Sequence, residues 1–321
     1  MLSYLQAIVI GALQGVTELF PVSSLGHSVL VPALIGGSWK HLVTESSTSS
    51  SESSPYLAFI VALHVATAIA LLVFFRREWV RIIRALLTSI APSLRARRLI
   101  ADDPDSRLAW LLVIGTIPVG ITGIALEHTF RTLFAKPVAA AAFLTTNGLI
   151  LLIGEQLRRR ASRPEQDDAA SVPTDGEGVS DGAIVGGDLP ARSRRALASL
   201  DYREAGFIGL FQTLALLAGI SRSGITMVGG LVRGLNHEDA ARFSFLLATP
   251  IILAAGVLKL PSLFGHAGDH IHGQVAVGFV VAGLCAYAAV RFLDRFFRTR
   301  TLTPFALYSL AGGVFCLIRF A

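Results

Sequence analysis

Two segments of this chain carry ionisable and hydroxyl side chains within otherwise apolar sequence. The first, residues 10–28, places Gln14 and Glu18 four residues apart and ends in a Pro-Val-Ser-Ser-Leu-Gly-His run. This spacing puts both side chains on one face of a helix. The second, residues 208–226, contains a Gly-Ile-Ser-Arg-Ser-Gly run that includes Arg222. A carboxylate, an imidazole, a guanidinium and several hydroxyls are groups suited to binding and hydrolysing a pyrophosphate.

The two segments are copies of one sequence. An offset of 198 (212 − 14) aligns Gln14 with Gln212. The same offset aligns Ile10 with Ile208, Gly11 with Gly209, Ser23 with Ser221 and Gly26 with Gly224. The copies differ at the positions with reactive side chains: Glu18 aligns with Leu216, Ser24 with Arg222 and His27 with Ile225. An internal duplication in an apolar chain is typical of membrane proteins that build a site between repeats, so both copies are expected to serve one anionic substrate.

In each copy, the first helix is predicted to end at a break, after which a second helix begins. The free N–H groups and positive dipole end of such a helix suit phosphate oxygens. The planar guanidinium of Arg222 can bind two phosphate oxygens at once. A purely structural buried ion pair is the alternative for Glu18, and a plain N-cap is the alternative for Ser23. The residues expected to open these helices are Ser23, Ser24, Gly26 and His27 in the first copy, and Ser221, Arg222, Ser223 and Gly224 in the second.

The composition is that of an integral membrane protein. The 321 residues are 53% hydrophobic and 16% charged, with a mean hydropathy of +0.61. A soluble domain would carry about 25% charged residues. Six apolar stretches approach the roughly 20 residues that a helix needs to cross a bilayer. They lie near residues 56–75, 107–126, 137–154, 239–260, 274–290 and 302–318.

The net charge of +6 reflects membrane topology rather than nucleic-acid binding. Arginines gather in residues 76–107, 158–203 and 291–300, which follow the first, third and fifth apolar stretches, while the alternate connections hold few basic residues. Basic connections lie in the cytoplasm. Consequently, the first copy enters the membrane from outside and the second from inside.

The predicted fold is all-α, with six transmembrane helices and two re-entrant helical hairpins in an inverted repeat whose tips meet near the membrane midplane. We expect one integral membrane domain. Its parts are a first hairpin at 1–36, a Ser-rich outer loop at 37–55 and three transmembrane helices at 56–154. A disordered cytoplasmic linker at 155–203, a second hairpin at 204–235 and three transmembrane helices at 236–321 follow.

Other polar residues are assigned structural roles. His64 is expected to make a helix-packing hydrogen bond, with a supporting role at the site as the alternative, and Asn147 is expected to bond across helices. Asn236 is predicted to cap the fourth transmembrane helix together with Asp239. The isolated Cys285 and Cys316 indicate neither a disulfide nor a thiolate metal site. Three histidines, His266, His270 and His272, are taken as a solvated outer loop.

On these motifs, the chain resembles the bacterial undecaprenyl-pyrophosphate phosphatase family of the bacitracin-resistance type. Residues 14–18 match its (E/Q)-x-x-x-E motif, residues 21–27 its P-V-S-S-x-G-H motif, and residues 218–224 its P-G-T-S-R-S-G motif. The resemblance covers nearly everything except residues 37–54 and 160–200. Three positions depart from the family pattern: Leu25 replaces Thr or Ser, Ala218 replaces Pro, and Ile220 replaces Thr. Phosphate contacts from positions 25 and 220 are therefore not assumed.

The resemblance implies removal of the terminal phosphate from undecaprenyl pyrophosphate, which recycles the lipid carrier for peptidoglycan synthesis and confers bacitracin resistance. It also implies a divalent cation, Mg²⁺ or Ca²⁺, held by Glu18 with Gln14 nearby. Arg222, with Ser221 and Ser223, would clamp phosphate. His27 with Glu18, Ser24 activated by His27, or water are the alternatives for the nucleophile.

The expected location is the bacterial inner membrane, as a multi-pass protein surrounded by bilayer lipid, with a homodimer left open and no nucleic-acid partner. The alternative function is a polyprenyl-phosphate flippase, since inverted repeats with touching hairpins also suit transport. A structural scaffold would leave Glu18, His27 and Arg222 without a role.

Overall fold

The computed structural model describes residues 2–40, 42, 55–101, 103–125, 136–161, 197–259 and 271–321. In this part of the chain the structure is all-α and contains no strand. Residues 44–54 of the predicted outer loop, residues 162–196 of the predicted linker, and His266 and His270 lie outside the described residues. The linker was predicted to be disordered over 155–203, but residues 155–161, 197–199 and 202–203 are helical. The helices are α1 (Tyr4–Thr17), α2 (Ser24–Ile35), α4 (Pro55–Phe74), α5 (Arg76–Ala96), α6 (Pro104–Ala125), α8 (Pro137–Ala161), α10 (Tyr202–Gln212), α11 (Arg222–Val232), α12 (His237–Lys259), α13 (His272–Phe296) and α14 (Thr303–Phe320), with short 3₁₀ turns η1 (Leu197–Ser199) and η2 (Thr213–Leu216).

Long apolar helices make this a multi-pass membrane protein. Five described helices, α6, α8, α12, α13 and α14, are long and apolar enough to cross a membrane, and α4 with α5 brings the number to six if that bent pair is one span. These helices coincide with the six predicted apolar stretches. Asn236 caps α12 as predicted, since its Oδ1 accepts the Asp239 N–H at 2.7 Å.

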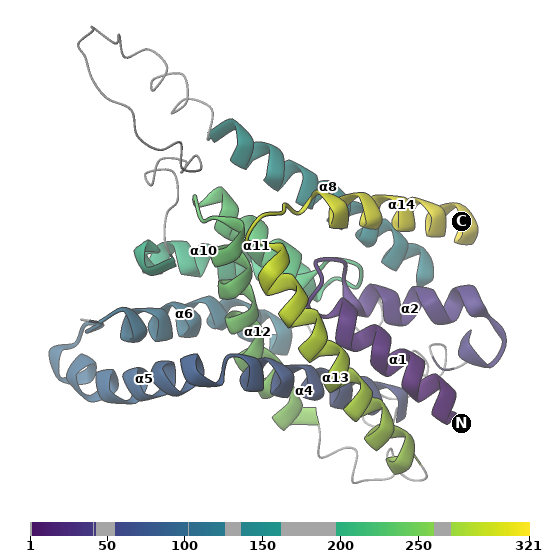
Figure 1. Cartoon of the computed structure of the whole chain (residues 1–321), viewed down its shortest axis with the longest axis horizontal. Helices are drawn as coiled ribbons and strands as arrows, with labels where there is room; N and C mark the ends of the chain where they lie inside the picture. The colour runs from purple at the N-terminus through teal and green to yellow at the C-terminus, as the bar shows by residue number, and fades with distance from the viewer. Residues whose placement is uncertain are drawn as a thin grey trace, which may run out of the picture.

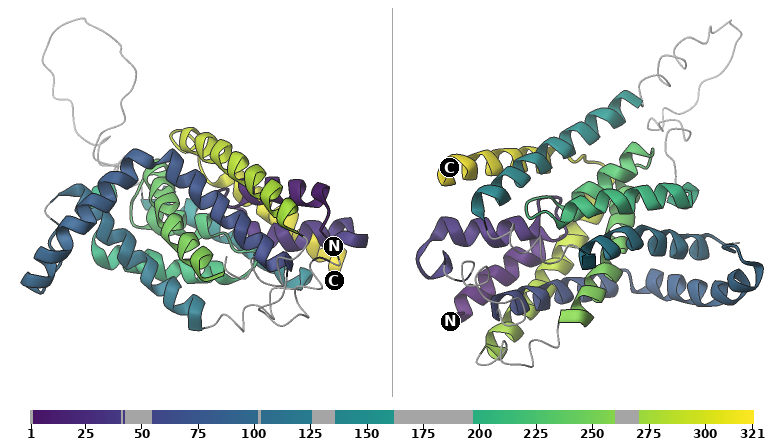
Figure 2. Two further views of the ribbon diagram at one scale, coloured as in Figure 1. Left: turned by 90° about the horizontal axis from the view of Figure 1, so that it is seen from below. Right: turned by 180° about the vertical axis from the view of Figure 1, so that it is seen from behind.

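A feature that the sequence analysis did not predict is the helix α5. Residues 76–96 were assigned to a basic connection, yet they form a 21-residue helix bent by 89° from α4. The amphipathic spacing of its apolar residues accounts for this helix. The bend is visible in the left view of Figure 2.

The two copies of the repeated segment fold as two broken pairs of short helices, α1 with α2 and α10 with α11 (Figure 1). The first break spans residues 18–23, so α1 ends before the predicted break at Pro21. Proline disfavours helical conformation in the preceding residue, and Ser23 adopts φ 69°, a left-handed value that a helix cannot contain. The second break is longer and contains η2. Whether these pairs are re-entrant and inverted stays a prediction.

Aligned glycines in the two copies make equivalent close contacts. A Cβ on Gly11 of α1 would lie 2.6 Å from the carbonyl oxygen of Gly278 in α13. A Cβ on Gly209 of α10 would collide in the same way with the carbonyl oxygen of Gly115 in α6. Small residues allow helix backbones to approach closely where lipid supplies no hydrophobic driving force between helices. The repeat therefore preserves the packing surface that holds each short helix against a long one.

Candidate active site

The tips of the two helix pairs interlock through hydrogen bonds. Ser23 Oγ accepts the N–H of Gly26, which caps α2, and also accepts the N–H of Gly219 in the other tip at 3.1 Å. In return, Ser223 Oγ donates to the carbonyl of Phe20 at 3.1 Å. Two segments about 200 residues apart in sequence thus satisfy each other's backbone groups. Such pairing is what non-helical backbone requires inside a membrane.

Asn147 of α8 joins both tips. Its Nδ2 donates to the carbonyl of Pro21 at 3.0 Å and to Ser309 of α14 at 3.2 Å, and its Oδ1 accepts the N–H of Ser221 at 2.9 Å. The side chain is 1% exposed. The sequence analysis expected a bond across helices here, but not a contact with both copies at once.

Glu18 is the centre of the polar cluster between the tips. Its Oε1 lies 2.5 Å from Nη2 of Arg222 in the second copy. Its Oε2 accepts from the hydroxyl of Ser24 and from Nε2 of Gln14 at 3.0 Å, and lies 3.2 Å from Nε2 of His64. A buried carboxylate needs such partners because transfer of a lone charge out of water costs several kcal/mol. The structure therefore brings Glu18 and Ser24 of the first copy and Arg222 of the second copy to one point.

A cavity of about 230 Å³ opens beside this cluster. Its walls combine charged and hydroxyl groups from the tips with apolar side chains from the long helices. The α4 residues Val61 and His64 lie in the first half of their helix, and the α12 residues from Ile251 to Gly256 lie in the second half. The lining residues from the tips are Glu18, Ser23, Ser24, Leu25, Ala215, Ile220, Ser221 and Arg222.

Arg222 lines this cavity and has a buried nitrogen without a hydrogen-bond partner in the part of the chain that the structure describes. Nη2 contacts Glu18, whereas Nη1 is buried and has no hydrogen-bond partner among the described residues. An unsatisfied buried donor is costly, by about 1–3 kcal/mol or more for a charged group. A ligand with anionic oxygens in the cavity would relieve that cost.

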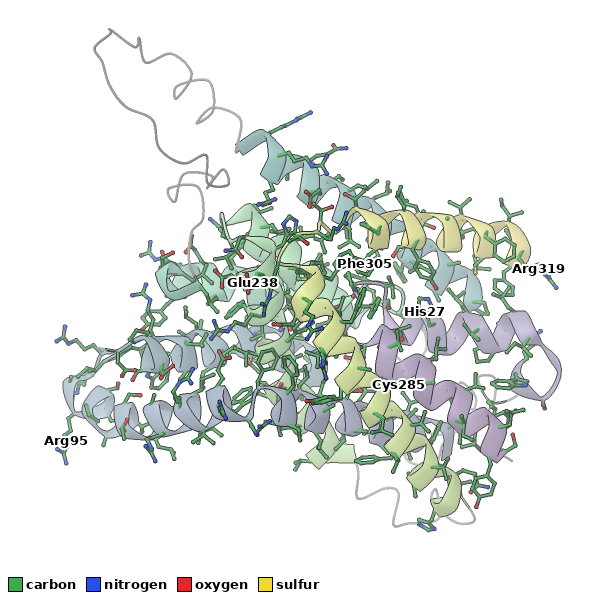
Figure 3. All side chains as sticks on the ribbon, viewed as in Figure 1. His27, Arg95, Glu238, Cys285, Phe305 and Arg319 are labelled. Carbon is green, nitrogen blue, oxygen red and sulfur yellow. The ribbon has the colours of Figure 1, made fainter. Side chains whose placement is uncertain are left out.

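His27 lies away from the cavity. Its Nδ1 is 2.7 Å from the carbonyl of Ser23, and its Nε2 is 2.8 Å from the hydroxyl of Tyr308 in α14. It is not among the residues that line the cavity. Figure 3 shows His27 at the start of α2, toward the side where α8 and α14 lie. The structure thus pairs Glu18 with His64, whereas the sequence analysis expected the pairing with His27.

The other predicted site residues serve the tips themselves. The N–H of Gly26 and that of Gly224 donate to the capping serines Ser23 and Ser221. A Cβ on Gly26 would lie 3.0 Å from Cα of Gly219. These glycines consequently allow the two tips to approach closely. Ser223 also contacts Ser221, at 3.0 Å between the hydroxyl oxygens.

His64 was weighed as a packing residue, yet it lines the cavity. The signal that identifies it is an ionisable side chain in the middle of an apolar span, which is a functional hypothesis by default. The ring is held by the carbonyl of Ile60, 2.8 Å from Nδ1, so that Nε2 faces Glu18. Sequence alone did not indicate which polar cluster this helix face would meet.

Oxygen ligands for a divalent cation are present beside the cavity. Gln14 Oε1 is buried and has no hydrogen-bond partner in the described part of the chain, while its Nε2 fixes Glu18. The described residues contain no cluster of three His, Cys, Asp or Glu side chains able to hold a metal. The donor set of one carboxylate, one amide oxygen and nearby hydroxyls fits a hard cation that substrate phosphates also bind, as is usual for Mg²⁺.

The chain is similar to known proteins over nearly its whole length. The family model described as bacitracin resistance protein BacA matches residues 7–315. The undecaprenyl-diphosphatase 2 of Frankia alni is 61% identical, over 100% of this chain and 98% of that protein. The undecaprenyl-diphosphatase of Mycolicibacterium paratuberculosis is 59% identical, over 97% of this chain and 96% of that protein. The undecaprenyl-diphosphatase 1 of Burkholderia pseudomallei is 40% identical, over 97% of this chain and 94% of that protein.

Proposed function

Because this chain belongs to the family of the bacitracin resistance protein BacA, we propose that it is a membrane-bound undecaprenyl-diphosphatase. It hydrolyses the phosphoanhydride of undecaprenyl pyrophosphate and releases undecaprenyl phosphate and inorganic phosphate. This reaction returns the lipid carrier to peptidoglycan synthesis and confers bacitracin resistance. The observation that carries the proposal is the contact of Glu18 with Arg222 across the two tips, in one cavity.

Arg222 and the tip hydroxyls bind the diphosphate in this mechanism. The free Nη1 of Arg222 donates to the terminal phosphate and stabilises the charge that develops on its oxygens as the anhydride breaks. Ser221 and Ser223 line the same tip and supply hydroxyl donors when the tips separate slightly around the headgroup. Apolar wall residues such as Val61 and Ile252 contact the first isoprene units of the lipid.

Ser24 is the nucleophile that the contacts favour. Its hydroxyl already donates to Glu18, which accepts the proton while Ser24 Oγ forms a bond to the terminal phosphorus. The P–O bond to the leaving undecaprenyl phosphate breaks, and water then hydrolyses the phosphoserine. His27 supports this step indirectly, since it binds the carbonyl of Ser23 and fixes the turn that presents Ser24.

Glu18 and Gln14 would hold a divalent cation, Mg²⁺ or Ca²⁺, whose bound charge neutralises the diphosphate. The unpartnered Gln14 Oε1 supports this assignment. We expect EDTA to reduce phosphate release by at least tenfold and added Mg²⁺ to restore it. Full activity after exhaustive chelation would contradict the assignment, whereas recovery with Ca²⁺ alone would identify the other ion.

The cavity faces the outer half of the membrane in this proposal. Under the predicted topology α4 starts outside and α12 ends outside, and the lining residues come from these outer halves. The headgroup is thus cleaved at the outer leaflet of the bacterial inner membrane. The homodimer considered from the sequence stays a prediction, which the mass of the detergent-purified protein would test.

A phosphate-release assay with purified protein and a polyprenyl diphosphate tests the function. We expect Arg222→Ala to lower the rate by about 100-fold or more, because it removes a donor to the transition state. Arg242→Ala is the matched control, since Arg242 makes a similar ion pair with Glu78 far from the cavity. Lipid translocation across vesicles without phosphate release would overturn the proposal in favour of a flippase.

A further inference from the structure

The helix α5 leaves the bundle at a right angle. It is bent by 89° from α4, a predicted transmembrane helix. A helix perpendicular to a transmembrane helix runs along the membrane plane. The arginine distribution places this end of α4 on the cytoplasmic side. The left view of Figure 2 shows the two helices meeting at one end of the molecule.

One face of α5 fixes this orientation. Arg81 lies 3.2 Å from Asp105, and Trp110 Nε1 donates to Ser89 at 3.0 Å. Residues eight apart on α5 thus contact the first turns of α6, as expected for helices that cross. Glu78 accepts from Arg242, near the start of α12, at 2.6 Å. The helix is therefore attached to the cytoplasmic ends of two predicted transmembrane helices.

A second face of α5 is apolar and has no covering among the described residues. Positions 80, 87 and 94 are seven residues apart, so they form one line along the helix. Exposed aliphatic side chains in such number normally mark a surface that meets lipid or a partner. The strip consists of Val80 (61% exposed), Ile83 (49%), Leu87 (64%), Ile90 (36%) and Leu94 (73%).

A third face, beside the apolar strip, is basic. Arg77, Arg84 and Arg95 are exposed and lie about 40–80° around the helix axis from Val80 and Leu87. They form no ion pair with any residue that the structure describes. Figure 3 shows Arg95 at the end of α5 that is remote from the bundle.

We propose that α5 is an in-plane helix of the cytoplasmic leaflet that binds anionic lipid headgroups. The apolar strip lies among the upper acyl-chain carbons, and Arg77, Arg84 and Arg95 contact the lipid phosphates. A membrane surface fits both strips at once, because it presents hydrocarbon and negative charge at adjacent depths. A second copy of α5 fits less well, since a two-fold contact would bring two basic strips together.

Spin labels in full-length protein test the depth of the helix. The background is Cys285→Ala with Cys316→Ala, accepted only if it retains phosphatase activity. Labels are placed by Leu87→Cys in the apolar strip and by Arg84→Cys in the basic strip. In nanodiscs that contain phosphatidylglycerol, we expect the label at 87 to collide mainly with oxygen and the label at 84 mainly with a water-soluble nickel relaxant. Equal access of the nickel relaxant to both labels would overturn the proposal.

The role of lipid charge is tested with the same label at position 87. Each arginine near an anionic surface favours binding by about fivefold. Replacing phosphatidylglycerol by phosphatidylcholine, or combining Arg77→Gln, Arg84→Gln and Arg95→Gln, should therefore increase nickel access severalfold. The matched control combines Arg291→Gln and Arg295→Gln on α13 with Arg298→Gln two residues after that helix, and it should leave nickel access unchanged. A label insensitive to lipid charge, or strong coupling between labels on two copies, would contradict the proposal.

Discussion

At the scale of the residue, Glu18 has four polar neighbours and can therefore remain buried. Three of these neighbours also constrain the chemistry. Arg222 compensates its charge, Gln14 fixes its orientation, and Ser24 offers it a proton. We expect substrate phosphates to compete with Glu18 for Arg222, since both would be anionic oxygen ligands of one guanidinium. Substrate binding is thus expected to free the carboxylate for proton transfer.

The choice of nucleophile can be decided by two substitutions. We expect Ser24→Ala to reduce phosphate release by about 10³-fold or more, because no other described hydroxyl donates to Glu18. His27→Ala should cost less, about tenfold, since it disturbs only the turn at Ser23. The matched control is Ser28→Ala, which removes a buried hydroxyl one turn further along α2.

Rapid-quench trapping gives an independent measurement of this step. A phosphorylated serine should accumulate in the wild-type protein and in the Ser28→Ala variant, and not in Ser24→Ala. A larger loss of rate in His27→Ala than in Ser24→Ala, together with phosphohistidine, would assign the nucleophile to His27 instead. If no phosphorylated enzyme is trapped and the Ser24→Ala variant is active, water is the nucleophile.

At the scale of the element, α8 acts as the frame for both tips. Asn147 satisfies the carbonyl of Pro21 and the N–H of Ser221, two backbone groups that no helix pairs. Leucine at this position has a similar volume and makes none of these hydrogen bonds. The two tips would then lose the side chain that hydrogen-bonds to both of them.

We expect Asn147→Leu to destabilise the protein by about 1–3 kcal/mol, because it leaves buried backbone groups unpaired. The rate of phosphate release should fall by more than the stability loss explains, since Ser24 and Arg222 are no longer held in register. Thermal unfolding in detergent and the turnover rate are measured together. Thr146→Val serves as the control, because Thr146 bonds only within its own helix. Unchanged turnover in Asn147→Leu would show that the tips hold each other unaided.

At the scale of the whole molecule, the site is shared between the two halves of the chain. Glu18 and Ser24 belong to the first half, and Arg222 belongs to the second. The halves also pack along α1 with α13 and along α8 with α14, as Figure 1 shows. Assembly should therefore not require a continuous chain.

A split protein tests this expectation. Residues 1–179 and 180–321, expressed together, should copurify and release phosphate at a rate within about threefold of the intact chain, since side-chain packing between helices drives their association in membranes. Either half alone should be inactive, because each lacks part of the charged pair. Halves that insert but fail to copurify would contradict the idea that the tips and helix faces suffice for assembly.

Much of the site could be predicted from the sequence because the repeat itself locates it. Gln14, Glu18, Ser24 and Arg222 stand out as polar residues in apolar sequence, and the offset of 198 identifies the second tip once the first is recognised. The apolar stretches predict the long helices, because the bilayer fixes their length. The helix α5 was missed because a basic, amphipathic segment resembles a solvated connection when only hydropathy is considered.

Sequence alone determined which ionisable residues stand in apolar segments and which segments are long enough to cross the bilayer, because burial of charge and bilayer thickness act on composition and length. Tertiary structure decided which of these residues meet. It turned His27 toward Tyr308, brought His64 from a separate helix to Glu18, and joined both tips through Asn147. These outcomes depend on how helix faces pack, and packing depends on side chains far apart in the chain that no local pattern relates to one another.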